Sequence, residues 1–160
     1  MEPRGSRGPG VWLPPPLIFA AGLLIGWFLD ARVHPLPLVS LRGEIPMAMC
    51  GAAVLLVGAC LSAWGLLTFV RAKTAVAPIQ PASKLVQHGP YRYTRNPMYM
   101  GMTIAYIGLA AFMDTAWPLL LLPLVILGLY RFVIVHEEAY LQREFGDLYD
   151  DYRRRVRRWL

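Results

Sequence analysis

The stretch MAMCGAAVLLVGACLSAWGLLTFV, residues 47–70, contains no charged residue and is rich in glycine and alanine. As an α-helix, a run of this length would extend about 36 Å, which exceeds the ~30 Å hydrocarbon core of a bilayer. No loop or sheet edge could cross that core, because its backbone groups would lack hydrogen-bond partners there. Residues 47–70 therefore predict a transmembrane helix.

Three more apolar runs flank this stretch. Residues 12–29 are uncharged, residues 98–113 are short and apolar, and residues 116–135 carry Arg131 as their one charge. The whole chain of 160 residues is 56% hydrophobic and 16% charged, which is too apolar for an ordinary soluble domain. We predict a single-domain, all-α integral membrane protein with about four transmembrane helices, at 12–29, 47–70, 98–113 and 116–135.

The basic residues cluster beside the apolar runs. Of the sixteen lysines and arginines, five lie in residues 71–97 and six in residues 143–158. Short loops rich in lysine and arginine remain on the cytoplasmic side of a membrane. The net charge of +6 is thus explained by topology rather than by nucleic-acid binding. We expect the 71–97 loop, the 136–160 tail and both termini to be cytoplasmic.

The tail, residues 136–160, has an amphipathic pattern. Its apolar residues recur at three- and four-residue steps, and its charged residues fall between them. This spacing is typical of an amphipathic helix that lies in the membrane interface. The predicted apolar face comprises Leu141, Phe145, Leu148, Tyr152, Val156 and Trp159, and the predicted polar face comprises Asp147, Asp150, Arg154 and Arg158.

Two polar clusters stand out against this apolar background. The first precedes the third apolar run and contains Lys84, His88, Tyr91, Arg92, Arg95, Asn96 and Tyr99. The second follows the fourth run and contains His136, Glu137 and Glu138. Because a short turn joins runs three and four, we expect an antiparallel hairpin that places Glu137 near Asn96 and Pro97. Carboxylates at the end of a membrane span are costly unless they are paired or hydrated.

A purely structural interpretation of these clusters is also open. Arg92 and Arg95 can act as topology determinants, the tyrosines can form an aromatic belt, and the glutamates can pair with the arginines.

Some chemistries are not predicted. The sequence has no glycine-rich phosphate loop and no histidine or cysteine spacing typical of a metal site, so we predict no bound metal.

Two ordered motifs carry a resemblance to a known group of enzymes. LVQHGPYRYTRNPMYMG (85–101) and HEEAYLQREFGDLYDDYRRRVRRW (136–159) resemble the integral-membrane isoprenylcysteine carboxyl methyltransferases and phospholipid methyltransferases. The shared patterns are G-x-Y-x-x-x-R-x-P-x-Y-x-G and E-E…F-G-x-x-Y-x-x-Y. They fall here on Gly89, Tyr91, Arg95, Pro97, Tyr99 and Gly101, and on Glu137, Glu138, Phe145, Gly146, Tyr149 and Tyr152. The resemblance covers about residues 70–160.

The resemblance implies methyl transfer from S-adenosylmethionine, bound on the cytosolic side, to a lipophilic acceptor that enters from the bilayer. That acceptor could be a prenylcysteine carboxylate, another isoprenoid or a phospholipid. A small bacterial homologue in the inner membrane is the expected context. The implied cofactor-binding residues are Ser83, Lys84, Leu85, Val86, Tyr91, Asn96, Pro97, Met98, Tyr99 and Glu137. We add His88, Arg95 and His136 from the two clusters, and Gly89 from the Gly89-Pro90 turn.

Arg131 and Glu138 are the predicted catalytic residues. The resemblance implies an arginine that binds the acceptor four residues before the first glutamate, but Val133 occupies that position here. Either Arg131 takes over this role, or the acceptor is not a prenylcysteine carboxylate. Snorkelling to the interface, or an ion pair with Glu138, would give Arg131 a structural role instead.

Two other functions remain open at this point. Membrane sterol reductases carry a similar motif and bind NADPH. A non-enzymatic anchor could use the basic run RRRVRR (153–158) to bind anionic lipid. Gly22 and Gly26 form a G-x-x-x-G pair that permits close helix packing, but the oligomeric state is not predicted.

Overall fold

The computed structural model describes residues 10–11, 13–38, 47–74 and 83–159. Its α-helices are α1 (Pro15–Arg32), α2 (Met47–Ala72), α3 (Pro97–Phe112), α4 (Trp117–Leu129), α5 (Val135–Phe145) and α6 (Asp147–Arg155). A short 3₁₀ helix, η1 (Gly89–Arg92), precedes α3, and a π-helical segment, η2 (Tyr130–Ile134), joins α4 to α5. The all-α prediction is confirmed.

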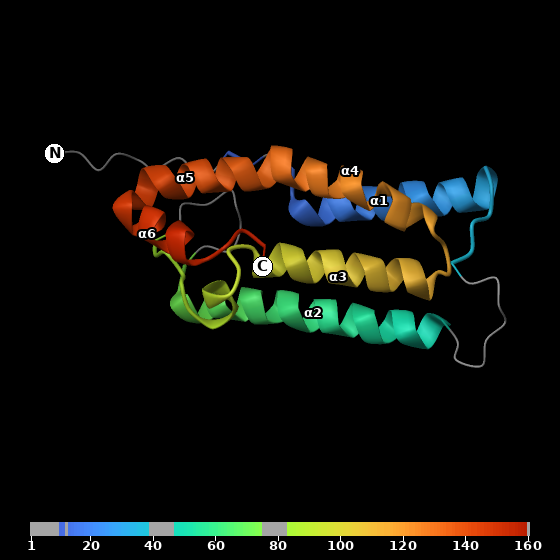
Figure 1. The fold of residues 1–160 in the computed structure, drawn as a ribbon, viewed down its shortest axis with the longest axis horizontal. Helices are drawn as coiled ribbons and strands as arrows, with labels where there is room; N and C mark the ends of the chain where they lie inside the picture. The colour runs from blue at the N-terminus through green and yellow to red at the C-terminus, as the bar shows by residue number, and fades with distance from the viewer. Residues whose placement is uncertain (1–9, 12, 39–46, 75–82, 160) are drawn as a thin grey trace.

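Three helical segments are long and apolar enough to cross a membrane, and α3 is a shorter apolar helix beside them. The three are α1, α2 and the continuous segment Trp117–Phe145. The helices lie roughly side by side, with the 83–97 segment and α6 at one end of the bundle (Figure 1). We call this end, with its polar side chains, the site end, and the end with the α3–α4 turn the turn end. The start of the predicted 12–29 span, Trp12, lies outside the described residues.

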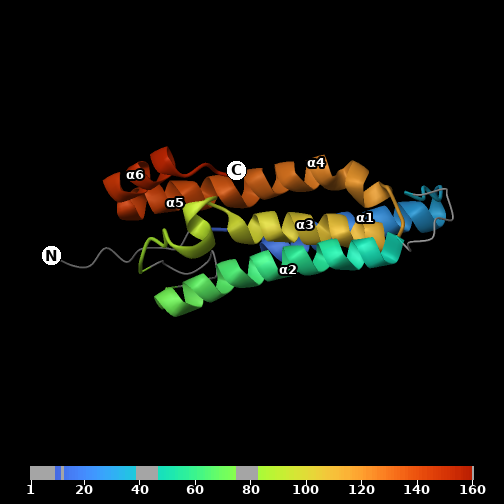
Figure 2. The ribbon, with the colours of Figure 1, turned by 60° about the horizontal axis from the view of Figure 1, so that its bottom comes forward.

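The helices associate as two antiparallel pairs. In Figures 1 and 2, α2 lies along α3, and α1 lies along α4. The predicted hairpin of spans three and four is thus only partly correct. A turn at Met113–Ala116, with Asp114 at φ 50°, does join α3 and α4. However, each helix packs mainly on a different partner, because small residues on α2 and α1 permit a closer approach there.

The α2–α3 seam depends on glycines from both helices. A methyl group at Gly58 would collide with the backbone nitrogen of Ala105, and one at Gly108 with the backbone nitrogen of Leu55. Such close backbone approach is how transmembrane helices gain van der Waals contact where lipid is as apolar as the side chains. The seam therefore fixes the start of α3, and the site residues on it, relative to α2.

The G-x-x-x-G pair of α1 is used within the chain. A methyl group at Gly22 would lie 2.9 Å from the Tyr106 hydroxyl oxygen, and one at Gly26 would lie 2.8 Å from the Pro118 nitrogen. Both glycines are buried against α3 and α4. The predicted close helix packing is therefore confirmed as an intramolecular contact.

The fourth span and the tail differ from their predicted boundaries. The helix does not end at residue 135 but continues through η2 and α5 to Phe145. Gly146, at φ 51°, then ends it and reverses the chain into the short helix α6. The prediction of a single tail helix over 136–160 is thus wrong. Glycine suits the position of the reversal, because a non-glycine residue would be strained at this backbone angle. The new register exposes Leu148 and buries Tyr149.

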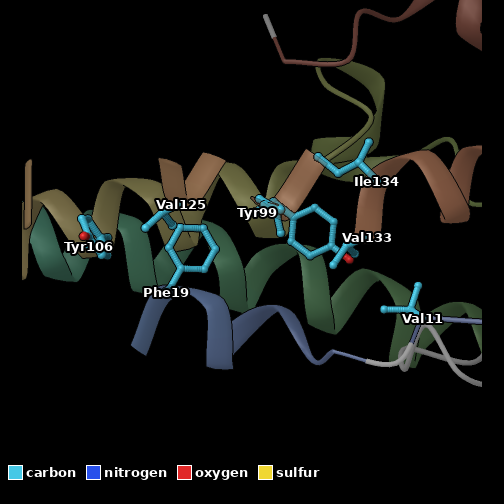
Figure 3. Close-up of a cluster of buried hydrophobic side chains, with 8 residues drawn as sticks. Val11, Phe19, Tyr99, Tyr106, Val125, Val133 and Ile134 are labelled. Atoms are coloured by element: carbon cyan, nitrogen blue, oxygen red, sulfur yellow. The ribbon is translucent and has the colours of Figure 1, made fainter. Parts of the chain in front are cut away.

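The main core lies between α1, α3 and the α4–α5 segment (Figure 3). Its buried side chains are Val11, Phe19, Tyr99, Tyr106, Val125, Leu129, Val133 and Ile134. Large apolar side chains also cover the outside of the bundle, among them Leu24, Ile25, Leu56, Val57 and Leu124. An exterior of this kind suits contact with lipid, in agreement with an integral membrane protein.

Candidate functional site

Residues 83–96, the described part of the chain that leads into α3, form a compact cap at the site end. Val86 is buried, and Gly89 begins η1 at φ 62°. A methyl group at Gly89 would lie 3.0 Å from the Thr68 Oγ1 atom of α2. Glycine is required at this position by both its backbone angle and its close approach to α2. Pro97 then starts α3, where its missing N–H and fixed φ suit the first helical turn.

A short hydrogen bond joins the two polar clusters. The hydroxyl of Tyr99, on α3, donates to Glu137 Oε1, on α5, over 2.6 Å. Tyr99 is buried in the main core, so this bond forms where little water can replace it. This bond places Glu137 beside Tyr99, in the first turn of α3, which agrees with its predicted position near the Asn96–Pro97 turn even though α3 packs mainly along α2.

Glu138 is the centre of an ion-pair network. Its carboxylate lies 3.3 Å from Arg95 Nη1 and accepts two hydrogen bonds, both 2.8 Å long, from Arg158. The alternative, purely structural interpretation included pairing of an arginine of the first cluster with a glutamate, and Arg95 forms such a pair. Arg95 also donates to the Tyr149 hydroxyl over 3.2 Å. The hydrogen bond to Glu138 raises the pKa of the Arg158 guanidinium, which remains charged.

The C-terminal segment, residues 156–159, returns to the cap and bonds to it through its backbone. The carbonyl of Arg157 accepts from the Arg95 N–H, and the carbonyl of Arg158 accepts from the Thr94 hydroxyl and from Asn96 Nδ2. All three bonds are 3.0 Å long. One of the two Nδ2 hydrogens of Asn96 is therefore engaged within the chain, and the other hydrogen and the Oδ1 atom remain for a ligand.

Tyr91 is the most conspicuous buried polar side chain of the cap. It is 5% exposed, and its ring packs edge-on against Phe69 of α2. Its carbonyl accepts from the Tyr152 hydroxyl over 2.7 Å, but its own hydroxyl has no partner among the described residues. Burial raises the pKa of Tyr91, so the hydroxyl stays protonated. A buried hydroxyl without a partner is a position where a ligand can supply one.

The structure groups the predicted site residues into an inner and an outer set. The inner set meets at the junction of the cap, α3 and α5, and consists of Tyr91, Arg95, Asn96, Pro97, Tyr99, Glu137 and Glu138. Leu85 packs on α6, Val86 is buried, and Met98 and Gly89 face α2. Ser83, Lys84, His88 and His136 are exposed around this core of the site.

Arg131 lies apart from the network. It is exposed on η2 and forms no hydrogen bond or ion pair with any residue that the structure describes. The alternative pairing with Glu138 is not observed, because Arg95 and Arg158 occupy that carboxylate. Val133, at the position where the resemblance implies an arginine, is 0% exposed and belongs to the main core. The role of Arg131 in holding an acceptor stays a prediction.

Four residues of the site were not predicted. Thr94 and Tyr152 are buried and tie the cap to the C-terminal segment, and Tyr149 contacts Arg95. Arg158 was assigned to the polar face of the tail but binds Glu138. Tyr149 and Tyr152 belong to the second motif, so their spacing could have identified them. The position of Arg158 depends on the chain reversal at Gly146, which the helical pattern did not show.

The fold and the site together define an integral-membrane α-helical protein with a polar, partly buried site at one end of its bundle. Residues 47–148 match the phospholipid methyltransferase family, and the chain belongs to that family. The matched range includes both the cap and the two glutamates, and it ends within α6.

Curated relatives show similarity over parts of the chain. A 72-residue segment is 39% identical to a protein-S-isoprenylcysteine O-methyltransferase of Schizosaccharomyces pombe, and covers 45% of this chain and 30% of that protein. A 108-residue segment is 28% identical to a probable protein-S-isoprenylcysteine O-methyltransferase of Oryza sativa subsp. indica, and covers 66% of this chain and 56% of that protein. An uncharacterized protein of Haemophilus influenzae is 35% identical over 63 residues, which are 39% of this chain and 79% of that protein. The chain thus spans about a third to a half of the length of the two named methyltransferases.

Proposed function

We propose that this protein transfers a methyl group from S-adenosylmethionine to a lipophilic acceptor at the cytosolic face of the membrane. The observation that carries the proposal is the 2.6 Å hydrogen bond between Tyr99 and Glu137. It joins the two motifs, far apart in sequence, into one site within the family-matched range. The names of the S. pombe and rice relatives support an acceptor of the prenylcysteine type.

The polar groups of the site suit the chemistry of this cofactor. S-adenosylmethionine supplies a methyl group on a cationic sulfur, together with an ammonium, a carboxylate, ribose hydroxyls and an adenine ring. In the described part of the chain, Glu137 accepts a hydrogen bond from Tyr99 through Oε1. The other carboxylate oxygen of Glu137 can accept from the ammonium or a ribose hydroxyl. The Tyr91 hydroxyl and Asn96 Oδ1 offer a further donor and a further acceptor. The tyrosine faces also favour a nearby cation.

The side chains of the site need only bind and orient for this reaction. A displacement at a methyl group requires the nucleophile in line with the leaving atom and at near-attack distance. Glu137, Tyr91 and Asn96 would hold the donor, and the packed core around Tyr99 would exclude water from it. Exclusion of water also strengthens each of these polar contacts.

Residues other than those that hold the cofactor would bind the methyl acceptor. A carboxylate acceptor needs a cation, and Arg131 is an exposed guanidinium on the same helical segment as Glu137. Val133 gives an apolar wall where the resemblance implies an arginine. We therefore propose three acceptor classes, namely a prenylcysteine carboxylate held by Arg131, another isoprenoid, or a phospholipid. The lipid-facing exterior would let such an acceptor enter from the bilayer.

The proposed orientation follows from charge. The site end carries Lys84, Arg92, Arg143 and the arginines of α6 and the C-terminal segment. The positive-inside rule favours this end on the cytoplasmic side, with both termini there and, for a bacterial protein, in the inner membrane.

Calorimetric titration of the detergent-purified protein tests the proposal. S-adenosylhomocysteine, the demethylated product, should bind, and NADPH should not. The Glu137→Ala variant should lose binding, because a carboxylate that contacts the ligand is removed. The Glu144→Ala variant, which removes an exposed carboxylate of the same helix, should bind as the wild type does. NADPH binding would indicate a reductase instead, and binding of neither ligand by the folded protein would favour a membrane anchor.

A further inference from the structure

We propose that Arg158 is a positioning residue that holds the cap in register with the glutamates of α5. This inference rests on the proposed function, because the register matters for a ligand held between Glu137 and the cap. It assigns a role to a C-terminal arginine outside the family-matched range 47–148.

The side chain of Arg158 binds the α4–α5 segment. Its Nε and Nη2 atoms each donate to a different oxygen of Glu138, both over 2.8 Å. Its guanidinium also lies 5.2 Å from the ring centroid of Tyr130, on η2. A two-pronged arginine–carboxylate contact fixes orientation as well as distance, and the aromatic ring adds a second constraint on the same group.

The backbone of Arg158 binds the cap. Its carbonyl accepts from the Thr94 hydroxyl and from Asn96 Nδ2, and the preceding carbonyl accepts from the Arg95 N–H. Arg158 therefore joins the residues immediately before Pro97 to α5, the helix that carries Glu137. Asn96 and Glu137 are both proposed to contact the ligand, so the distance between them matters for binding. Arg158 and the direct ion pair of Arg95 with Glu138 both constrain that distance.

Nearby arginines make weaker or more exposed contacts than Arg158 does. Arg155 donates to Gln87 Oε1 of the cap over 3.1 Å, but this contact is exposed. Arg153 and Arg154 pair with Asp150 and Asp151 of their own helix, at i,i+3 spacing, and their side chains are 54% and 71% exposed. The side chains of Arg158 and Glu138 are 35% and 20% exposed, and Arg95, the other partner of Glu138, is 12% exposed. A partly buried charge that loses its partner is destabilised far more than an exposed one.

The test combines two measurements on the full-length protein in detergent. The first is hydrogen–deuterium exchange of a peptide that contains the Arg95 amide, the donor to the Arg157 carbonyl. The second is the dissociation constant of S-adenosylhomocysteine. The variants are Arg158→Gln, Arg158→Lys as a conservative rescue, and Arg154→Gln as the matched control.

We expect Arg158→Gln to speed exchange at this peptide and to weaken S-adenosylhomocysteine binding about tenfold or more, with the protein still folded. Arg158→Lys, which keeps the charge but loses the two-pronged contact, should fall between Gln and wild type. Arg154→Gln should change neither measurement. The Thr94→Val variant removes one donor to the Arg158 carbonyl and also the acceptor of the Asn96 N–H, which bonds to Thr94 Oγ1 over 3.2 Å. It should therefore speed exchange at the Arg95 amide itself, apart from any change at Asn96, even if Arg158→Gln proves unfolded.

The two readouts separate this inference from the proposed function. Wild-type exchange in Arg158→Gln and Thr94→Val would overturn the positioning role, whatever the ligand affinity. Faster exchange with unaltered affinity would also overturn it, since the connection would then be structural only. If the wild type fails to bind S-adenosylhomocysteine, the proposed function fails, and the role of Arg158 in positioning a ligand fails with it. Faster exchange in Arg158→Gln would then show only that Arg158 stabilises the cap.

Discussion

The two ends of the bundle both carry polar networks, but they differ in how completely these are satisfied. At the turn end, Asp30 accepts from the Leu36 N–H over 2.9 Å and from the Thr115 hydroxyl over 2.7 Å, and Trp117 Nε1 donates to the His34 carbonyl. At the site end, two arginines share Glu138. Among the described residues, the buried side-chain atoms without a partner are Tyr91 Oη, Arg95 Nε and Gln142 Oε1, all at the site end.

The difference in hydrogen-bond satisfaction indicates a structural role for the turn end and a ligand-binding role for the site end. The turn end uses a side chain to satisfy the backbone after α1, which closes the connection to α4 and leaves little for a ligand to add. The site end keeps buried donors and a carboxylate whose polar capacity is not filled by the chain. Incomplete satisfaction costs stability and is tolerated where a ligand completes the network.

The largest expected effect on stability is at the turn end. Asp30→Ala removes two hydrogen bonds to a carboxylate, and we expect a loss of about 2–4 kcal/mol in the free energy of unfolding. S-adenosylhomocysteine affinity should be unchanged, since the substitution lies at the opposite end of the bundle. Unfolding in mixed micelles and calorimetry measure the two quantities. A large loss of affinity without a loss of stability would remove the distinction between the ends.

Tyr99→Phe should affect both quantities at the site end. It removes the donor to Glu137 and leaves a carboxylate among apolar neighbours, which costs about 1–3 kcal/mol. Affinity for S-adenosylhomocysteine should fall about tenfold, because Glu137 is no longer held in place. Thr103→Val is a suitable control, as it removes a hydroxyl of α3 that bonds only within its helix. Equal affinity in Tyr99→Phe and wild type would show that this bond does not orient the site.

Arg131→Ala should separate turnover from binding. Arg131 is exposed and outside the network, so stability should change by less than about 0.5 kcal/mol. If Arg131 holds an acceptor carboxylate, transfer of labelled methyl into a membrane extract should fall about tenfold at unchanged cofactor affinity. Arg143→Ala, an exposed arginine on α5, serves as the control. Unaltered transfer would leave Arg131 without a role in the reaction.

The smallest effect concerns alkaline stability. Burial raises the pKa values of Tyr149 and Tyr152 above the ordinary value of 10.0. Above about pH 10 the unfolded chain loses these protons while the folded protein retains them, so stability should fall as pH rises through this range. Tyr149→Phe should reduce that fall more than Tyr93→Phe, which alters an exposed tyrosine. A fall in stability that is the same in both variants would place the sensitive groups elsewhere.

The sequence was sufficient where a local pattern determines the outcome. The uncharged run 47–70 corresponds to α2, Met47–Ala72, because its length and apolarity specify a membrane helix. The run 98–113 corresponds to α3, Pro97–Phe112, a shorter apolar helix. The contact of Glu137 with Tyr99, at the start of α3, agrees with the position that chain order predicts for Glu137. These features can be predicted without knowing which helix faces pack against each other.

Other features depended on packing and could not be predicted. The pairing of α3 with α2 arises from glycines that match across the seam, such as Gly58 and Gly108, and such matching is visible only when both helices are in place. The chain reversal at Gly146 changes the register of the tail, so Tyr149 is buried and Leu148 is not. Arg158 reaches Glu138 only because of that reversal.

Mapping the residues that the cofactor contacts would show directly whether it binds at the site end. Ultraviolet photolabelling of the purified protein with radiolabelled S-adenosylmethionine, followed by peptide mapping, assigns the label to one end of the bundle. We predict label in peptides from residues 83–101 or 131–159, competed by S-adenosylhomocysteine and lost in Glu137→Ala. Competed label in peptides from residues 30–38 or 113–117, or label that excess S-adenosylhomocysteine does not displace, would contradict the assignment of the cofactor to the site end.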